Sequence, residues 1–182
     1  MRTIKHYLAC CALVSCAAAV PLESAAQYDH GKENTLRIAT YNIYNGKTVD
    51  AKSYNYDKQA GIIESINPDI IAIEEVDSAS ARSNNRYALG QYAGYLGMRA
   101  FYSPTIELEG GKYGMGLLAK NKPLAVKRIK LPGREEVRTA VIAEYPNYVF
   151  CGTHFSLNDD DRISSIRILC AEAEKYNKPF FL

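Results

Sequence analysis

The chain has 182 residues, of which 47% are hydrophobic and 23% are charged. These proportions are typical of one folded domain. The chain has 22 Lys and Arg residues and 20 Asp and Glu residues, so the formal net charge is only +2. This balance excludes a strongly basic nucleic-acid-binding arm and an acidic disordered tail.

Residues 1–26 have the pattern of a secretory signal peptide. Arg2 and Lys5 give a positive start, an apolar or small stretch follows over 7–20, and small residues end at Ala26. The apolar stretch is shorter than the roughly 20 residues that a membrane-spanning helix needs. We therefore expect export, periplasmic or secreted, with no transmembrane span.

A second way of processing the N-terminus stays open. Residues 13–16 (LVSC) resemble the box that precedes a lipidated cysteine in bacterial lipoproteins, with Cys16 as that cysteine. Cleavage before Cys16 leaves a very short apolar core, so cleavage after Ala26 is favoured. The polar residues 27–35 then form a linker.

The remaining chain alternates between strand-like and helix-like segments. Alternating or continuous apolar residues predict strands, and apolar residues at helical spacing predict helices. The predicted strands are 36–43, 69–76, 99–103, 113–119, 124–129, 139–144, 148–153 and 179–182, and the predicted helices are 54–66, 86–96 and 162–176. This order predicts a mixed α/β layered fold.

The last predicted helix also carries one of two cysteines that follow the signal segment. Its periodicity predicts that Ile163 and Ile166 lie on the buried face. We expect Cys151, in a predicted strand, and Cys170, in this helix, to be buried free thiols rather than a disulfide.

Polar side chains stand at the ends of several predicted strands. Asn42 and Glu75 end the first two strands, and His154 ends a later one. Because ligands bind at the carboxyl ends of strands in open α/β sheets, we expect these three residues to meet at one rim. Carboxylate and amide oxygens are hard donors, so Glu75 and Asn42 predict a site for Mg²⁺ or Mn²⁺.

Five segments, in this order along the chain, resemble the endonuclease/exonuclease/phosphatase superfamily of metal-dependent phosphohydrolases. They are 36–46 (LRIATYNIYNG), 67–77 (NPDIIAIEEVD), 113–123 (YGMGLLAKNKP), 135–145 (EEVRTAVIAEY) and 151–162 (CGTHFSLNDDDR). The resemblance covers about 36–182 and implies an α/β (α+β) fold, a four-layer sandwich of two mixed β-sheets flanked by helices.

The resemblance also implies roles for single residues. Glu75 is similar to the family's metal-binding glutamate, and Asn42 to the asparagine beside it. His154 is similar to the histidine that faces the phosphate, and Arg138 to an arginine of the site. Tyr113 is a candidate substrate contact.

Other readings of these residues stay open. Asn42 is also suited to capping the turn that follows it. For Arg138, an ion pair that holds Glu75 or Glu136 in place is as good an interpretation as a contact with the substrate. Asn158 is a second candidate substrate contact, although loop or packing roles suit both it and Tyr113.

The sequence departs from the family pattern in three places. Glu74 stands where many members carry Gln, and Ser156 stands where many carry Asp. The family's Gly-Asp-x-Asn and Asp-His motifs, which position the attacking water and complete the metal shell, do not follow 179–182. We therefore expect 36–182 to be the N-terminal part of such a domain, with an incomplete fold and no general base.

These observations predict an exported, divalent-metal-dependent hydrolase of phosphodiesters or phosphomonoesters, or an inactive fragment of one. The alternative is a non-catalytic secreted domain that binds phosphate or phospholipid on a degraded enzyme scaffold. The expected partner is a small phosphoester, a nucleotide or a phospholipid headgroup. The basic cluster at 127–130 is interpreted as a solvated strand face, so no strong nucleic-acid track is expected.

Overall fold

The computed structural model describes residues 35–182, so the predicted signal peptide lies outside the described residues. The strands are β1 (Ile38–Asn42), β2 (Ile70–Ser78), β3 (Arg99–Leu108), β4 (Gly111–Ala119), β5 (Ala125–Leu131), β6 (Arg138–Glu144), β7 (Val149–Thr153) and β8 (Phe180–Phe181). The helices are α1 (Tyr56–Ile66), α2 (Ala88–Leu96) and α3 (Asp159–Ala173), with short 3₁₀ turns η1 (Tyr44–Gly46) and η2 (Ala81–Ser83). Every predicted strand and helix is present, and β3 is longer than predicted.

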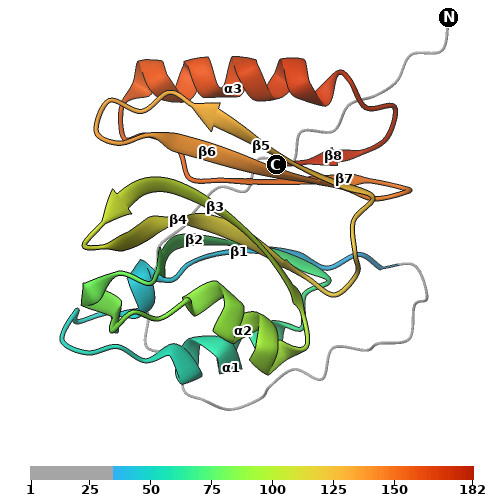
Figure 1. Cartoon of the computed structure of the whole chain (residues 1–182). Coiled ribbons are helices and arrows are strands. Elements are labelled where there is room, and N and C mark those ends of the chain that lie inside the picture. The colour runs from blue at the N-terminus through green and yellow to red at the C-terminus, as the bar shows by residue number, and fades with distance from the viewer. Residues whose placement is uncertain (1–34) are drawn as a thin grey trace, which may run out of the picture.

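The strands form two four-stranded sheets, in the orders β1-β2-β4-β3 and β5-β6-β7-β8. The β1–β2 and β7–β8 pairs are parallel and the other pairs are antiparallel, so both sheets are mixed. The sheets stack on one another, with α1 and α2 covering the outer face of the first and α3 that of the second (Figure 1). This confirms the predicted four-layer α+β sandwich.

Three apolar cores hold the four layers together. The core between the sheets includes Leu117 and Val141, which come from different sheets. Ile71 and Leu89 belong to the core under α1 and α2. Leu169 packs with the second sheet under α3. Burial of these apolar surfaces is the main favourable term in folding.

The rotation of α3 differs from the prediction. Ile163 and Ile166 are exposed, whereas Asp161, Leu169 and Glu172 are buried. The reason is that polar anchors near both ends of the helix face the sheet side. Asp161 accepts a hydrogen bond from the Arg134 backbone N–H, and Glu172 accepts one from the Lys127 ammonium.

The packing of β7 and α3 also determines which of the two cysteines is buried. Cys151 is a free thiol and is buried in β7, where burial raises its pKa to about 12. Cys170 is also free but is exposed. The expectation of a buried thiol was therefore wrong for Cys170, because the rotation of α3 turns that position to solvent.

The strand pairing brings the predicted site residues to one edge of the sandwich. In the first sheet, Asn42 at the carboxyl end of β1 lies opposite Glu74, at the middle of β2 where its register with β4 shifts. In the second sheet, β6 begins at Arg138 where the antiparallel β7 ends at Thr153, directly before His154. Within residues 35–182, no helix is long and apolar enough to cross a membrane.

Candidate active site

The backbone of β2 is irregular at the residue expected to bind metal. The register with β4 shifts between Ile73 and Val76, and Glu75 has a φ of +58°. A left-handed backbone is unfavourable for a residue other than glycine, at a cost on the order of 1–3 kcal/mol, and such strain collects at functional sites. The bulge leaves Glu75 half-buried, next to the fully packed Glu74.

The two adjacent glutamates occupy different surroundings. Glu74 is buried and accepts a 2.7 Å hydrogen bond from the Thr40 hydroxyl. Burial raises the pKa of Glu74 to about 7, although the Thr40 hydrogen bond acts in the opposite direction. The bulge thus separates a packed carboxyl group from one that reaches the rim.

Asn42 contacts Glu75 directly. Its amide Nδ2 donates a 2.7 Å hydrogen bond to Glu75 Oε1, while its Oδ1 accepts a 2.9 Å hydrogen bond from the Tyr44 backbone N–H. Asn42 therefore caps the turn and orients the Glu75 carboxylate at the same time. The contact with Tyr44 agrees with the capping role that the sequence left open for Asn42, and its role beside a metal ion stays a prediction.

Arg138 is a buried cation held by two carboxylates. It is 5% exposed, and its Nη2 and Nη1 lie 2.8 Å from Glu135 Oε1 and 2.7 Å from Glu136 Oε1. These contacts match the predicted bracing with Glu136. The Nε of Arg138 is buried without a hydrogen-bond partner.

His154 lies against the same guanidinium. Its Nδ1 is 3.4 Å from Arg138 Nη1. Because a guanidinium only donates, Nδ1 acts as the acceptor and the ring proton is on Nε2. Burial, together with the charge of Arg138, lowers the pKa of His154 below its usual value of 6.5. At neutral pH the ring is therefore a neutral donor through Nε2.

Arg138 and His154 line a small cavity of about 10 Å³, which has room for about one water molecule. Its lining comprises Thr105, Tyr113, Gly114, Met115, Glu136, Arg138, Thr139 and His154. The Thr139 hydroxyl is buried without a partner, as is Arg138 Nε. Unsatisfied buried donors are costly, so this cavity suits an oxygen-rich ligand.

Glu75 lies near this cavity. Burial is the main cause that raises the pKa of the Tyr113 phenol, and the negative charges of Glu75 and Glu136 add to it. The charge of Glu75 also acts on His154, where it partly offsets the lowering of the pKa. The first sheet thus supplies Glu75, Asn42 and Tyr113 to a site that the second sheet completes.

Asn158, like Asn42 and Glu75, is not among the residues that line the cavity. Its Oδ1 accepts hydrogen bonds from the backbone N–H groups of Asp160 and Asp161, at 3.1 and 3.3 Å. It is the N-cap of α3. This agrees with the loop role that the sequence left open for it.

Two members of the site were not singled out from the sequence. Glu135 holds both Arg138 and the backbone N–H of Leu157, and Thr139 lines the cavity. The acidic pair at 135–136, two residues before Arg138, was the available signal for Glu135. No pattern in the sequence distinguishes Thr139 from other strand threonines.

The site offers one carboxylate, that of Glu75, as an oxygen ligand for a hard divalent cation. Among residues 35–182, no three or more His, Cys, Asp or Glu side chains gather as a metal-binding group. Mg²⁺ commonly keeps several water ligands and takes one or two carboxylates plus substrate phosphates. Glu75, oriented by Asn42, is suited to be such a carboxylate.

The four-layer sandwich thus carries an acid–amide pair and a buried Arg–His pair at one edge. The sequence profile of the Endonuclease/Exonuclease/phosphatase family matches residues 39–181. The chain belongs to this family. A search of curated proteins finds no match.

Solved structures share the fold at low sequence identity. An endonuclease/exonuclease/phosphatase from Beutenbergia cavernae DSM 12333 has a TM-score of 0.62 and 17% identity, and the match covers 76% of this chain and 44% of that one. A mannosyl-6-phosphatase from Bacteroides thetaiotaomicron VPI-5482 has a TM-score of 0.58 and 13% identity, over 80% of this chain and 63% of that one. D. rerio TDP2 with a single-strand DNA product has a TM-score of 0.52 and 14% identity, and the match covers 80% of this chain and 58% of that one. This chain therefore spans less than two thirds of the length of each of these proteins.

The ionisation of His154 tests the geometry of the site. We expect its pKa to lie below 6.5 and to rise in Arg138→Gln, because the neighbouring positive charge is then lost. NMR titration of the ring protons measures this, with His154→Gln assigning the signal. Arg167→Gln on the outer helix α3 serves as the control and should leave the titration unchanged. An unchanged pKa in Arg138→Gln would contradict the described contact.

Proposed function

We propose that this chain forms the metal-binding and phosphate-binding part of a divalent-metal-dependent phosphoester hydrolase. The observation that carries the proposal is the Glu75–Asn42 pair beside the cavity lined by Arg138 and His154. Membership of the family supports it, because these enzymes are generally dependent on a divalent metal.

Each side chain has a defined task in this proposal. Glu75 would hold Mg²⁺ or Mn²⁺, and the Asn42 amide would keep the carboxylate in place. A divalent ion bound there stabilises the negative charge that develops on a phosphoryl group. His154 would donate its Nε2 proton to a phosphoryl oxygen, and Arg138 would supply a fixed positive charge beside it. Tyr113 would stay a neutral phenol, because burial raises its pKa.

Phosphoesters are the substrate class that this site fits, as phosphodiesters or phosphomonoesters. The structural neighbours include a mannosyl-6-phosphatase and a 2′,3′-cyclic phosphatase. The alternative proposal is a domain that binds phosphate or phospholipid headgroups without hydrolysing them. It is favoured by one observation, which is that no group of three or more His, Cys, Asp or Glu side chains gathers as a metal site within the described range.

The hydrolase proposal is tested with the full-length protein and p-nitrophenyl phosphate or bis-p-nitrophenyl phosphate. We expect Mg²⁺-dependent release of nitrophenol that stops with chelator and falls by about 100-fold or more in Glu75→Gln. Glu174→Gln, next to the end of α3, is the matched control and should retain activity. Hydrolysis that ignores both chelator and Glu75→Gln contradicts the proposal, and phosphate binding without turnover supports the binding domain instead.

Asn42→Asp tests whether the acid–amide pair faces a cation. The variant would place two carboxylates in contact at neutral pH, so we expect a loss of stability of about 1 kcal/mol or more with chelator present. Mn²⁺ should then raise the melting temperature of the variant more than that of the wild type. Asn121→Asp, on a loop at the opposite end of β2, is the control. A variant that Mn²⁺ does not stabilise would argue against metal binding by this pair.

We further propose that the protein acts after export, on the basis of the pattern in residues 1–26. Cleavage after Ala26 gives a mature protein that begins at Gln27. Mass spectrometry of the protein from cell fractions measures this N-terminus. A retained Met1 contradicts export by this route, and a lipid on Cys16 establishes the lipoprotein alternative.

A further inference from the structure

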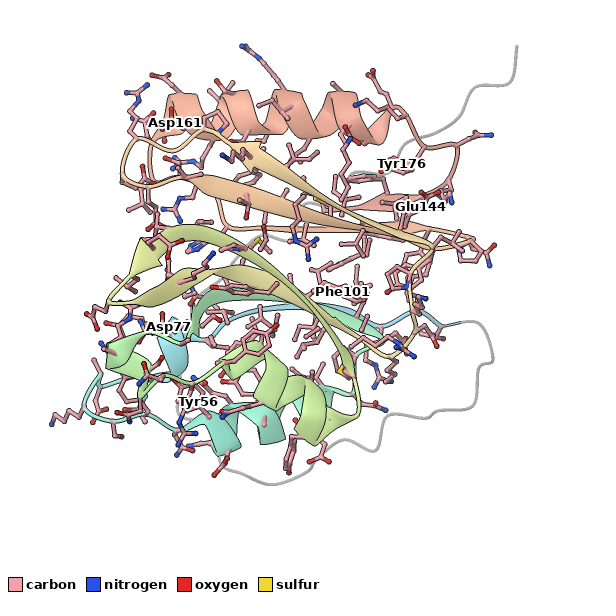
Figure 2. All side chains as sticks on the ribbon, in the orientation of Figure 1. Tyr56, Asp77, Phe101, Glu144, Asp161 and Tyr176 are labelled. Carbon is pink, nitrogen blue, oxygen red and sulfur yellow. The ribbon has the colours of Figure 1, made fainter. Side chains whose placement is uncertain are left out.

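A second guanidinium, that of Arg82, is fixed close to the candidate active site. Its Nε and Nη2 donate hydrogen bonds of 2.8 and 2.7 Å to the two carboxylate oxygens of Asp77. The Asp77 side chain is fully buried and also accepts a hydrogen bond from the Ser80 hydroxyl. Asp77 lies near the end of β2, toward the left end of the lower sheet in Figure 2. The two-point contact sets the plane of the guanidinium.

Tyr113 connects Arg82 to the cavity. The guanidinium carbon of Arg82 lies 5.3 Å from the centre of the Tyr113 ring, and Tyr113 lines the cavity together with Arg138 and His154. Arg82 is therefore one tyrosine ring away from the place where the first phosphoryl group would bind. The stacking adds a second constraint on the position of the guanidinium.

The remaining edge of Arg82 is available to a ligand. In the described part of the chain, Nη1 has no hydrogen-bond partner, and the side chain is 29% exposed. Arg138 differs, because both of its terminal nitrogens are held by carboxylates. Arg86, which lies over the Tyr56 ring at 5.2 Å, has no ion pair within residues 35–182 and adds positive charge to this part of the rim.

A fixed, partly open guanidinium is well suited to a phosphoryl group. Guanidinium groups bind phosphate oxygens through charge-assisted hydrogen bonds. Because Asp77 and Tyr113 already hold Arg82 in place, little side-chain freedom is lost when a ligand binds. A freely moving surface arginine lacks this advantage.

We propose that Arg82 is a specificity-determining residue that binds a second phosphoryl group of the substrate. This inference rests on the proposed function, because it places the first phosphoryl group beside Arg138 and His154, at the mouth of the small cavity. The preferred substrates then carry two phosphoryl groups near one another. A phosphomonoester without a second anionic group would engage only the inner part of the site.

Calorimetry with the full chain tests this without turnover, using inorganic phosphate, pyrophosphate and tripolyphosphate in chelator-treated buffer. We expect the wild type to bind tripolyphosphate at least about tenfold more tightly than phosphate. Arg82→Gln should lose this preference and keep its affinity for phosphate within about twofold. Arg167→Gln, which removes one positive charge from the outer face of α3, should keep the preference.

A second variant separates ligand binding from folding. Arg82→Gln leaves the buried Asp77 unpaired, which is destabilising by itself. The double variant Asp77→Asn with Arg82→Gln removes that charge, and it should fold and also lack the preference. The proposal is overturned if either folded variant keeps the preference, or if the wild type shows none. Failure of the hydrolase proposal is seen separately, as activity that does not depend on Glu75.

Discussion

The buried charge of Arg138 is the constraint on which the site depends. A guanidinium at the start of β6, between two sheets, is tolerated only with compensating carboxylates, and Glu135 and Glu136 supply them. The Arg138 hydrogen bond is also the main cause that lowers the pKa of Glu135 to about 2. Glu135 in turn accepts hydrogen bonds from the loop that leads into α3. One ion-pair network thereby fixes the loop, the first turn of the outer helix and the orientation of His154.

The two sheets contribute different chemistry to the shared edge. The first sheet brings a carboxylate with its amide partner, and the second brings a cation with a neutral imidazole. In the proposed function, neither sheet alone combines the ligand of the metal ion with the donors to the phosphate oxygens. The apolar core between the sheets therefore has a functional consequence, because it sets the distance between the two halves of the site.

Much of the architecture followed from local patterns. Apolar periodicity placed every strand and helix, and polar residues at strand ends pointed to Asn42, Glu75 and His154. The rotation of α3 did not follow, because Asp161 and Glu172 are held by partners distant in the chain, Arg134 and Lys127. Periodicity assumes that polar side chains face water, and it fails where an ion pair draws them inward.

The Asp77–Arg82 pair escaped prediction for a related reason. Both residues are charged and close in sequence, which usually describes an exposed turn. Only the fold shows that the carboxylate is fully buried and that the guanidinium stacks on Tyr113. The bulge at Glu75 was equally hidden, because a single register shift leaves no trace in a pattern of apolar residues.

The left-handed backbone at Glu75 has an evolutionary consequence. Glycine or asparagine fits that conformation with less strain, so either residue would make the strand more stable while removing the carboxylate. Selection for stability and selection for a charged rim therefore act in opposite directions at this position. In a related protein that no longer needs the carboxylate, substitution by glycine or asparagine would be favoured. The residue at this position therefore indicates whether a relative has kept the carboxylate.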